Sequence, residues 1–357
     1  MKSGLFDLAS LTDVNLLQDS TFNYFQKALE EKLTGTSYER YLKKQLKEEL
    51  IDQLLSTSIP NLNPVQKGWI DVVKKYSSSK ILLWTQKRTG GIELAEEVLK
   101  VAMQYQMTQI VVSLAEELQY HYTVINYDSR KHNRYTELLD NALHNYHSEL
   151  IAHKYYCQVI AKIQGNRTPE YVVREAEPFI MELEKLRDSV QSYRFHFLFY
   201  SLKIIRYQAG NNHTQIIKYC QEAFDFFNQI QTPLPYTTKF VFLSKQITPV
   251  IHQNNFEKAR NLLFDCLKLP KKGSYNWNAT LQHMVFLGFH SDRPELSYSA
   301  YQKVVKTRTK FDSPKLTEQW RIYKAYLVLY KRHGLLDIPE NLRLYKFLNE
   351  VPIQSQD

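Results

Sequence analysis

The chain has 357 residues, 43% of them hydrophobic and 23% charged, which is typical of a folded protein and excludes a disordered one. It contains only 10 glycines and 12 prolines, fewer than the turns of a large β or α/β protein require. The net charge of +9 leaves acidic proteins and nucleic acid as candidate partners.

Residues 1–60 are predicted to form a helical N-terminal cap. Apolar side chains recur every three or four residues over 38–55, and Thr36 with Glu39 forms a capping-box signature before them. The first eleven residues include Asp7 and lack the apolar core of a signal peptide. Nowhere do 18 apolar residues follow one another, so we expect a cytoplasmic protein with no membrane partner.

Between residues 61 and 334 the sequence predicts a repeating series of helices. Polar turns recur about 42 residues apart, at Gly165-Asn166, Gly210-Asn211-Asn212, Asn254-Asn255, Ser291-Asp292 and His333-Gly334. A second sign of a repeat is a spacing of 40 residues. Residues 222–226 resemble residues 262–266, and Ala102 and Ala142 occupy comparable places in their segments. The expected helix pairs occupy 65–105, 107–146, 147–186, 188–229, 236–269 and 274–308, followed by a helix over 314–333.

Several local signals support these elements. Helix starts are predicted where a capping residue precedes proline, at Asn63-Pro64, Thr168-Pro169 and Ser313-Pro314. The alternating aromatics of 193–207 could indicate a strand, but the apolar run is too long, so a helix buried on all sides is expected. Pro249 should kink or break the helix over 240–253. Residues 335–357 are predicted to form an irregular C-terminal tail.

The pattern resembles the tetratricopeptide superfamily of helical-hairpin repeats. Ala142-x-x-x-Tyr146 and Ala223-x-x-x-Phe227 are similar to the small and aromatic packing positions of that family's second helix. The spacing exceeds the family's 34 residues and the Trp-x-x-Leu-Gly signature is absent, so HEAT-like arrays fit equally well. The resemblance implies an all-α fold, a right-handed α-solenoid of stacked antiparallel helix pairs.

No pattern in the sequence indicates catalysis or a cofactor. The phosphate loop, the dinucleotide fingerprint, the GxSxG elbow and the HExxH zinc motif are all missing. His144, His147 and Glu149 are the best metal candidates, but they lack a further ligand at a fixed spacing, and a solvated helix face is the preferred interpretation. Cys157, Cys220 and Cys266 are expected to be buried thiols. We therefore expect a protein that is not an enzyme.

The resemblance implies a scaffold that binds a protein or peptide, possibly an acidic one, on the concave surface of the array. Candidate groove residues on the first helix of each pair are Tyr155, Arg194, Tyr200, Lys239 and His283. For each of them taken singly, a structural role is the preferred interpretation.

Two alternatives stay open. Residues 268–334 hold 13 lysines and arginines against 4 aspartates and glutamates, and aromatic side chains are interleaved with them. Such a surface can bind nucleic acid or acidic peptides, or can simply be solvated. The basic patch comprises Lys303, Lys306, Arg308, Lys310, Arg321 and Lys324. The second alternative is a regulatory sensor whose N-terminal helices act as the effector.

Overall fold

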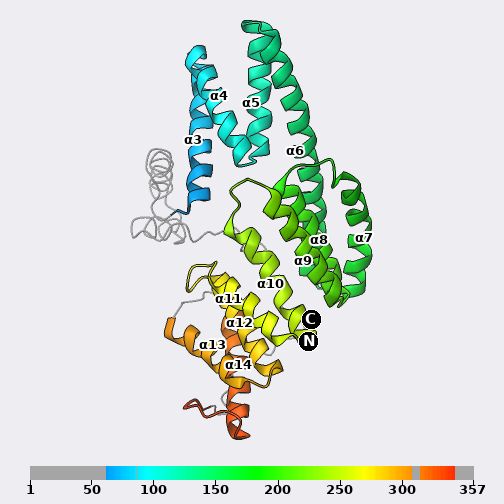
Figure 1. Cartoon of the computed structure of the whole chain (residues 1–357), viewed down its shortest axis with the longest axis vertical. Helices are drawn as coiled ribbons and strands as arrows, with labels where there is room; N and C mark the ends of the chain where they lie inside the picture. Colours follow the sequence, from blue (N-terminus) through cyan, green and yellow to red (C-terminus); the bar gives the residue numbers. More distant parts are fainter. Residues whose placement is uncertain (1–61, 86, 308–313, 342–357) are drawn as a thin grey trace, which may run out of the picture. The chain divides into compact units, whose positions relative to one another are not determined.

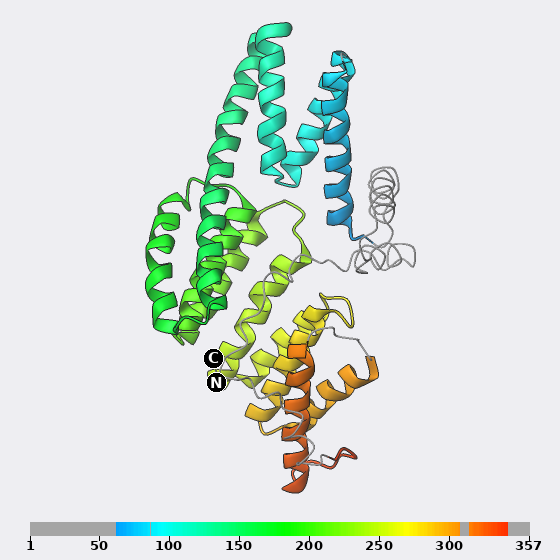
Figure 2. The same ribbon diagram turned by 180° about the vertical axis from the view of Figure 1, so that it is seen from behind.

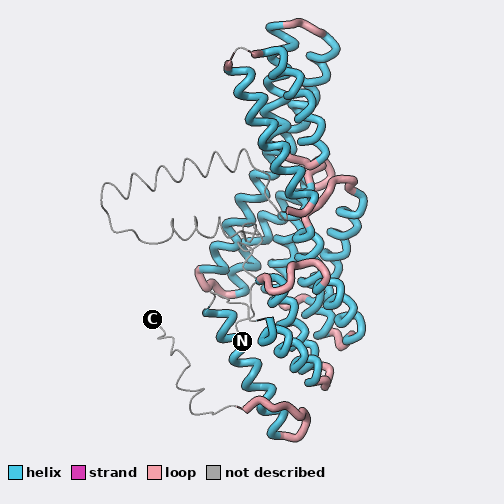
Figure 3. The backbone as a smooth tube through the Cα atoms, turned by 90° about the vertical axis from the view of Figure 1, so that its left-hand side faces the viewer, coloured by secondary structure: helices cyan, strands magenta, loops and turns pink. Residues whose placement is uncertain are grey.

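The computed structural model describes residues 62–85, 87–307 and 314–341, and every regular element in these ranges is a helix (Figure 3). The α-helices are α3 (Pro64–Trp84), α4 (Arg88–Gln104), α5 (Thr108–Tyr120), α6 (Ser129–Gln164), α7 (Pro169–Leu186), α8 (Tyr193–Ala209), α9 (His213–Gln229), α10 (Tyr236–His252), α11 (Phe256–Leu267), α12 (Tyr275–His290), α13 (Pro294–Thr307) and α14 (Pro314–Arg332). A π-helical turn, η3 (His121–Ile125), follows α5. The predicted all-α class is confirmed for these ranges, while the predicted cap at 1–60 lies outside them.

By packing, the chain divides into two compact units. The described part of unit 1 runs to Ile151 and includes Ser189–Phe195 and Gln231–Pro235, and unit 2 takes the remainder. Within each unit, helices pack against their neighbours in sequence: α3 on α4 and α4 on α5 in unit 1, and each of α9 to α14 on the next in unit 2 (Figures 1 and 2). None of these helices is long and apolar enough to cross a bilayer. The solenoid arrangement stays a prediction.

Unit 1 is organised around small side chains on α4. Ala95 and Ala102 are completely buried, and they let α4 lie close to Leu114 and Leu118, which are also fully buried on α5. Helix α3 begins at the predicted Asn63-Pro64 start. The Asn63 side chain accepts the N–H of Gln66 at 2.9 Å, and the Gln66 side chain accepts the N–H of Asn63 at 3.1 Å, which forms a capping box.

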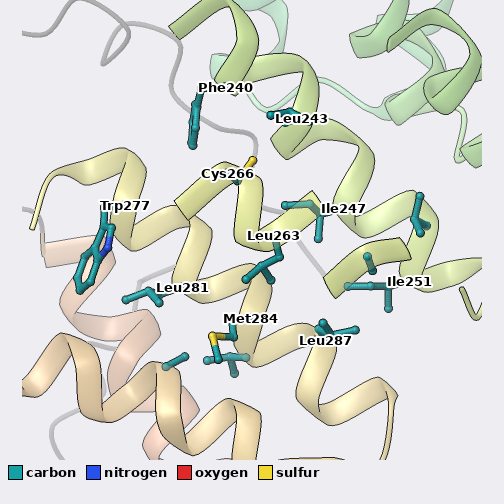
Figure 4. Close-up of a cluster of buried hydrophobic side chains, with 14 of the residues drawn as sticks. Phe240, Leu243, Ile247, Ile251, Leu263, Cys266, Trp277, Leu281, Met284 and Leu287 are labelled. Atoms are coloured by element: carbon teal, nitrogen blue, oxygen red, sulfur yellow. The ribbon is translucent and has the colours of Figure 1, made fainter. Parts of the chain in front are cut away.

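The core of unit 2 joins α10, α11 and α12. Figure 4 shows that α10 supplies Leu243, Ile247 and Ile251, α11 supplies Leu263 and Cys266, and α12 supplies Leu281, Met284 and Leu287. Ala300 of α13 and Trp320 of α14 belong to the same cluster. Burying such side chains contributes about 1.5–3 kcal/mol each, so this layer contributes substantially to the stability of the unit.

The segment with alternating aromatics is the predicted buried helix. Phe195, Phe199, Leu202 and Ile204 on α8 are all at most 1% exposed. α10 is similarly buried, and it continues past Pro249 to His252 rather than ending there. Pro249 lies in the last turn of α10, where its carbonyl still accepts the N–H of Gln253 at 3.1 Å.

The predicted polar turns share one backbone conformation. A left-handed residue, with φ between 49° and 70°, follows six helices, at Gln106, Asn166, Asn211, Asn254, Asp292 and Gly334. The next N–H donates to the carbonyl five residues earlier, as from Asn212 to Tyr207 at 2.9 Å. This bond defines a Schellman turn, which satisfies carbonyls at the helix end. Asn, Asp and Gly tolerate left-handed φ best, which explains the composition of five of these turns.

One predicted boundary is wrong. The expected break between residues 146 and 147 falls inside α6, which runs unbroken for 36 residues. The sequence there contains no proline or glycine, and the Ser148 hydroxyl donates back to the His144 carbonyl at 2.9 Å instead of capping a new helix, so the helix continues to the Gly165 turn.

Candidate functional site

The five predicted groove residues lie on four helices. Tyr155 is on α6, Arg194 and Tyr200 are on α8, Lys239 is on α10 and His283 is on α12. Arg194 belongs to unit 1 and the others to unit 2. Lys239 is exposed on α10.

Both tyrosines make contacts within the fold. Tyr155 donates to Glu182 at 2.5 Å, and its ring stacks on Phe179 with centroids 4.3 Å apart. The bond to this carboxylate raises the pKa of Tyr155. Tyr200 is only 5% exposed, and burial raises its pKa, with a smaller contribution from the negative charge of Glu222.

Arg194 lies beside a buried carboxylate in unit 1. Glu149 is 2% exposed and accepts hydrogen bonds from Thr108 at 2.6 Å and Ser192 at 2.5 Å, with Arg194 Nη1 at 3.8 Å. These bonds hold the connection before α8 against α5 and α6. Glu149 was the carboxylate of the metal hypothesis, and its Oε1 instead accepts from two hydroxyl groups while Oε2 faces Arg194.

The two histidines of the metal hypothesis differ from Glu149 in their burial. His144 and His147 are exposed, and His144 Nε2 lies 3.2 Å from the Ser189 hydroxyl. In the described ranges, no three histidine, cysteine or acidic side chains are grouped so that they could hold a metal ion.

Cys157 corrects another expectation. It is exposed on α6, with Sγ 3.6 Å from His153 Nε2 one turn earlier, whereas Cys220 and Cys266 are buried as predicted. Its apolar neighbours in sequence lie on other faces of the helix, so their hydrophobicity gave no information about position 157.

The described residues of the basic patch differ in exposure and in pairing. Lys303 and Lys306 are exposed on α13. Arg321 forms a two-pronged ion pair with Glu318, both bonds being 2.9 Å, which compensates its charge. Lys324 is half-buried, and Arg308 and Lys310 lie outside the described residues.

A set of hydrogen-bonding side chains links the first helices of consecutive pairs in unit 2. We call it the polar ladder; it consists of Gln208 (α8), Lys245 and Thr248 (α10), Gln282 and His283 (α12), and Gln319 (α14). Lys245 Nζ donates to Gln208 Oε1 at 3.1 Å, and Gln282 Nε2 donates to Gln319 Oε1 at 2.6 Å. Between these two bonds, the Thr248 hydroxyl lies 3.3 Å from His283 Nδ1. The ladder thus crosses four helices.

The two basic members of the ladder are strongly affected by burial. Burial lowers the pKa of Lys245 to about 8. Burial also lowers the pKa of His283 to about 4, and the positive charge of Lys245 adds to this effect. At neutral pH the ladder therefore presents one cationic ammonium beside a neutral imidazole and several amides, which suits a carboxylate or a peptide backbone.

The low pKa of His283 predicts acid sensitivity. In the unfolded chain the imidazole takes up a proton near pH 6.5, but in the folded chain only near pH 4, so the stability present above pH 6.5 is lost as the pH falls towards 4. The expected loss is about 3 kcal/mol. Urea unfolding at pH 7.5 and 4.5 should show a smaller difference for His283→Gln than for wild type. His333→Gln, at an exposed position, should not reduce it.

The ladder is visible in the sequence once the contacts are known. Gln208, Lys245, Gln282 and Gln319 are each separated by 37 residues. The same separation occurs in unit 1, where Tyr76 and Lys80 of α3 bond Ser113 and Glu117 of α5. The turns and the similar apolar segments predicted spacings of 40 to 42 residues, and these did not reveal the 37-residue offset.

The comparisons with known proteins add no relative. No protein-family model matches the chain, and no curated protein is similar to it.

Proposed function

We propose that the protein is a non-catalytic binding protein that takes up an extended peptide segment of a partner along the polar ladder of unit 2. The observation that carries this proposal is the placement of a hydrogen-bonding side chain on each of four consecutive first helices, at one fixed separation of 37 residues. Stacked helix pairs present such positions in a row, and rows of this kind form binding surfaces in helical-repeat proteins.

The dimensions of the ladder fit a short peptide. Neighbouring packed helices lie about 8–10 Å apart, so three steps from α8 to α14 cover about 30 Å. An extended chain rises about 3.3 Å per residue, which gives roughly nine residues. Glutamine amides both donate and accept, so they can pair with either group of a peptide bond.

Charge favours an acidic segment. Lys245 is buried in unit 2, and a carboxylate placed beside it would stabilise its protonated form and raise its lowered pKa. Binding of an acidic peptide should therefore take up protons near pH 8, which calorimetry in buffers of different ionisation enthalpy can detect.

The direct test uses peptides selected on the full chain from a random twelve-residue display library. Affinity is measured by fluorescence anisotropy for wild type and for a Gln282→Ala/Gln319→Ala variant. These two side chains bond each other, so their joint removal leaves no stranded partner and should preserve folding. We expect at least tenfold weaker binding.

The matched control replaces two exposed glutamines of α9, Gln221→Ala/Gln229→Ala, and should leave affinity unchanged. Peptides that bind all three proteins equally would count against the ladder. Binding of generic RNA or duplex DNA tighter than about 100 μM, lost in Lys303→Glu/Lys306→Glu, would favour the basic patch and a nucleic-acid partner instead.

A further inference from the structure

A second surface lies at one end of unit 1, where large apolar side chains are left outside the core. We call it the apolar tip, and its members, between 51% and 75% exposed, are Ile81, Trp84, Tyr120, Val124, Ile125 and Tyr127. They come from the end of α3, the end of α5, the π-helical turn η3 and the connection to α6, which lie on the same side of unit 1 in Figure 1. Monomers rarely leave so many apolar side chains in one region exposed.

Side-chain contacts hold these elements together. Lys80 of α3 pairs with Glu117 of α5 at 3.1 Å. Arg88, at the start of α4, donates from Nε to His121 Nδ1 at 3.3 Å, and its guanidinium lies 5.9 Å from the centre of the Tyr120 ring. The members of the tip are therefore neighbours in space.

A polar network fixes η3 in its unusual conformation. One oxygen of Glu96 accepts hydrogen bonds from Tyr122 at 2.9 Å, Lys131 at 3.0 Å and Tyr135 at 2.9 Å. Tyr122 is thereby anchored inside, while the following Val124 and Ile125 are turned outward. π-Helical turns are rare and occur often at functional sites.

Near the tip, several carboxylates are bonded within the unit, while the nearby cations have no described carboxylate within 4.0 Å. Three carboxylates near the tip are engaged inward: Glu96 in the network, Glu117 with Lys80, and Asp128 with the backbone N–H groups of residues 130 and 131, whereas Glu116, one turn before Tyr120 on α5, is exposed. Four cations lie at the starts of α4 and α6, namely Lys87, Arg88, Arg130 and Arg134, and no described carboxylate lies within 4.0 Å of their charged groups. Glu93 and Glu137 lie farther along α4 and α6.

We infer that the apolar tip binds an acidic segment of a partner protein that also carries apolar side chains. Trp, Tyr and Arg, all present here, are the residues that dominate protein–protein binding energy. Three of the four cations are arginines, whose planar donors match carboxylates in pairs. An anionic lipid surface normally requires four to eight basic residues. Arg88 is half-buried against His121, which leaves three exposed cations at the tip, so a protein segment fits better than a lipid surface.

The test again starts from the full chain and the twelve-residue library, followed by anisotropy at 50 and 300 mM NaCl. Two tip variants are compared with wild type, Trp84→Ser/Val124→Ser/Ile125→Ser and Lys87→Glu/Arg130→Glu/Arg134→Glu. Acidic, apolar peptides should lose at least tenfold in affinity with either variant, and wild-type binding should weaken with salt. All substituted side chains are exposed, and circular dichroism checks that folding is unchanged.

The matched controls are Met181→Ser/Leu335→Ser and Lys218→Glu/Lys258→Glu, which change exposed apolar and basic side chains elsewhere. They should leave affinity for tip peptides unchanged, as should the ladder variant Gln282→Ala/Gln319→Ala. Peptides that depend on the ladder alone would support the proposed function and refute the tip. The inference also fails if phosphatidylserine vesicles, but no peptide, distinguish the tip variants from wild type.

Discussion

Replacing Gly288 with alanine is expected to destabilise unit 2 by about 3 kcal/mol, at the upper end of the cost of overpacking a core. A Cβ at this position would lie 2.2 Å from Ser297 Oγ, 2.8 Å from the Ser297 backbone nitrogen and 2.9 Å from the Arg293 carbonyl oxygen. Two of these atoms are backbone and cannot rotate away, so α12 and the start of α13 must separate. Urea unfolding followed by far-UV circular dichroism should show a clearly lower midpoint.

Gly90→Ala provides the matched control. It also adds a methyl group to a helical glycine, but nothing lies within 4 Å of the new Cβ. Alanine is favoured over glycine in a helix by up to about 1 kcal/mol, so the midpoint should stay constant or rise. Equal effects at the two positions would show that close contact between α12 and α13 does not depend on Gly288.

Replacing Glu149 with leucine should cost unit 1 about 3 kcal/mol. The Thr108 and Ser192 hydroxyls both donate to Glu149 Oε1, and removing the acceptor leaves one half-buried and one buried donor without it. Each such loss costs about 1–3 kcal/mol. Urea unfolding measures the total, and hydrogen exchange should accelerate in Ser189–Phe195, the connection that these bonds hold.

The control removes one donor as well. In Thr108→Val/Glu149→Leu only the Ser192 hydroxyl loses a partner, and it keeps its place as acceptor of the Phe195 N–H at 3.3 Å, so part of the stability should return. A double variant less stable than Glu149→Leu would mean that the cost arises from packing around the leucine.

Sequence features that act locally were sufficient to predict much of the fold. The Asn63 and Thr168 caps hold because each side chain bonds a backbone N–H three residues ahead. The polar turns were recognised because asparagine and glycine adopt left-handed φ at low cost. The buried α8 was recognised because its apolar run is too long for a strand.

Features that depend on contacts between helices were not predicted. The exposure of Cys157 follows from which face of α6 points outward, and its flanking residues do not encode that face. The apolar tip was missed because the hydrophobicity of Val124 and Ile125 predicts burial, and only the bonds of Glu96 explain their outward position. The polar ladder required knowledge of which glutamines meet across helices.

The constant offset of 37 residues constrains how the gene for this protein can change in length. Deleting or duplicating a block of 37 residues within unit 2 would return the next helix to the same rotation and height, so the hydrogen-bonding positions would still meet. A block of 34 or 40 residues would rotate that helix by about 60° and slide it by about 4.5 Å relative to its neighbour. Gains and losses within unit 2 should therefore occur in whole modules of 37 residues, each with its two helices and its loops.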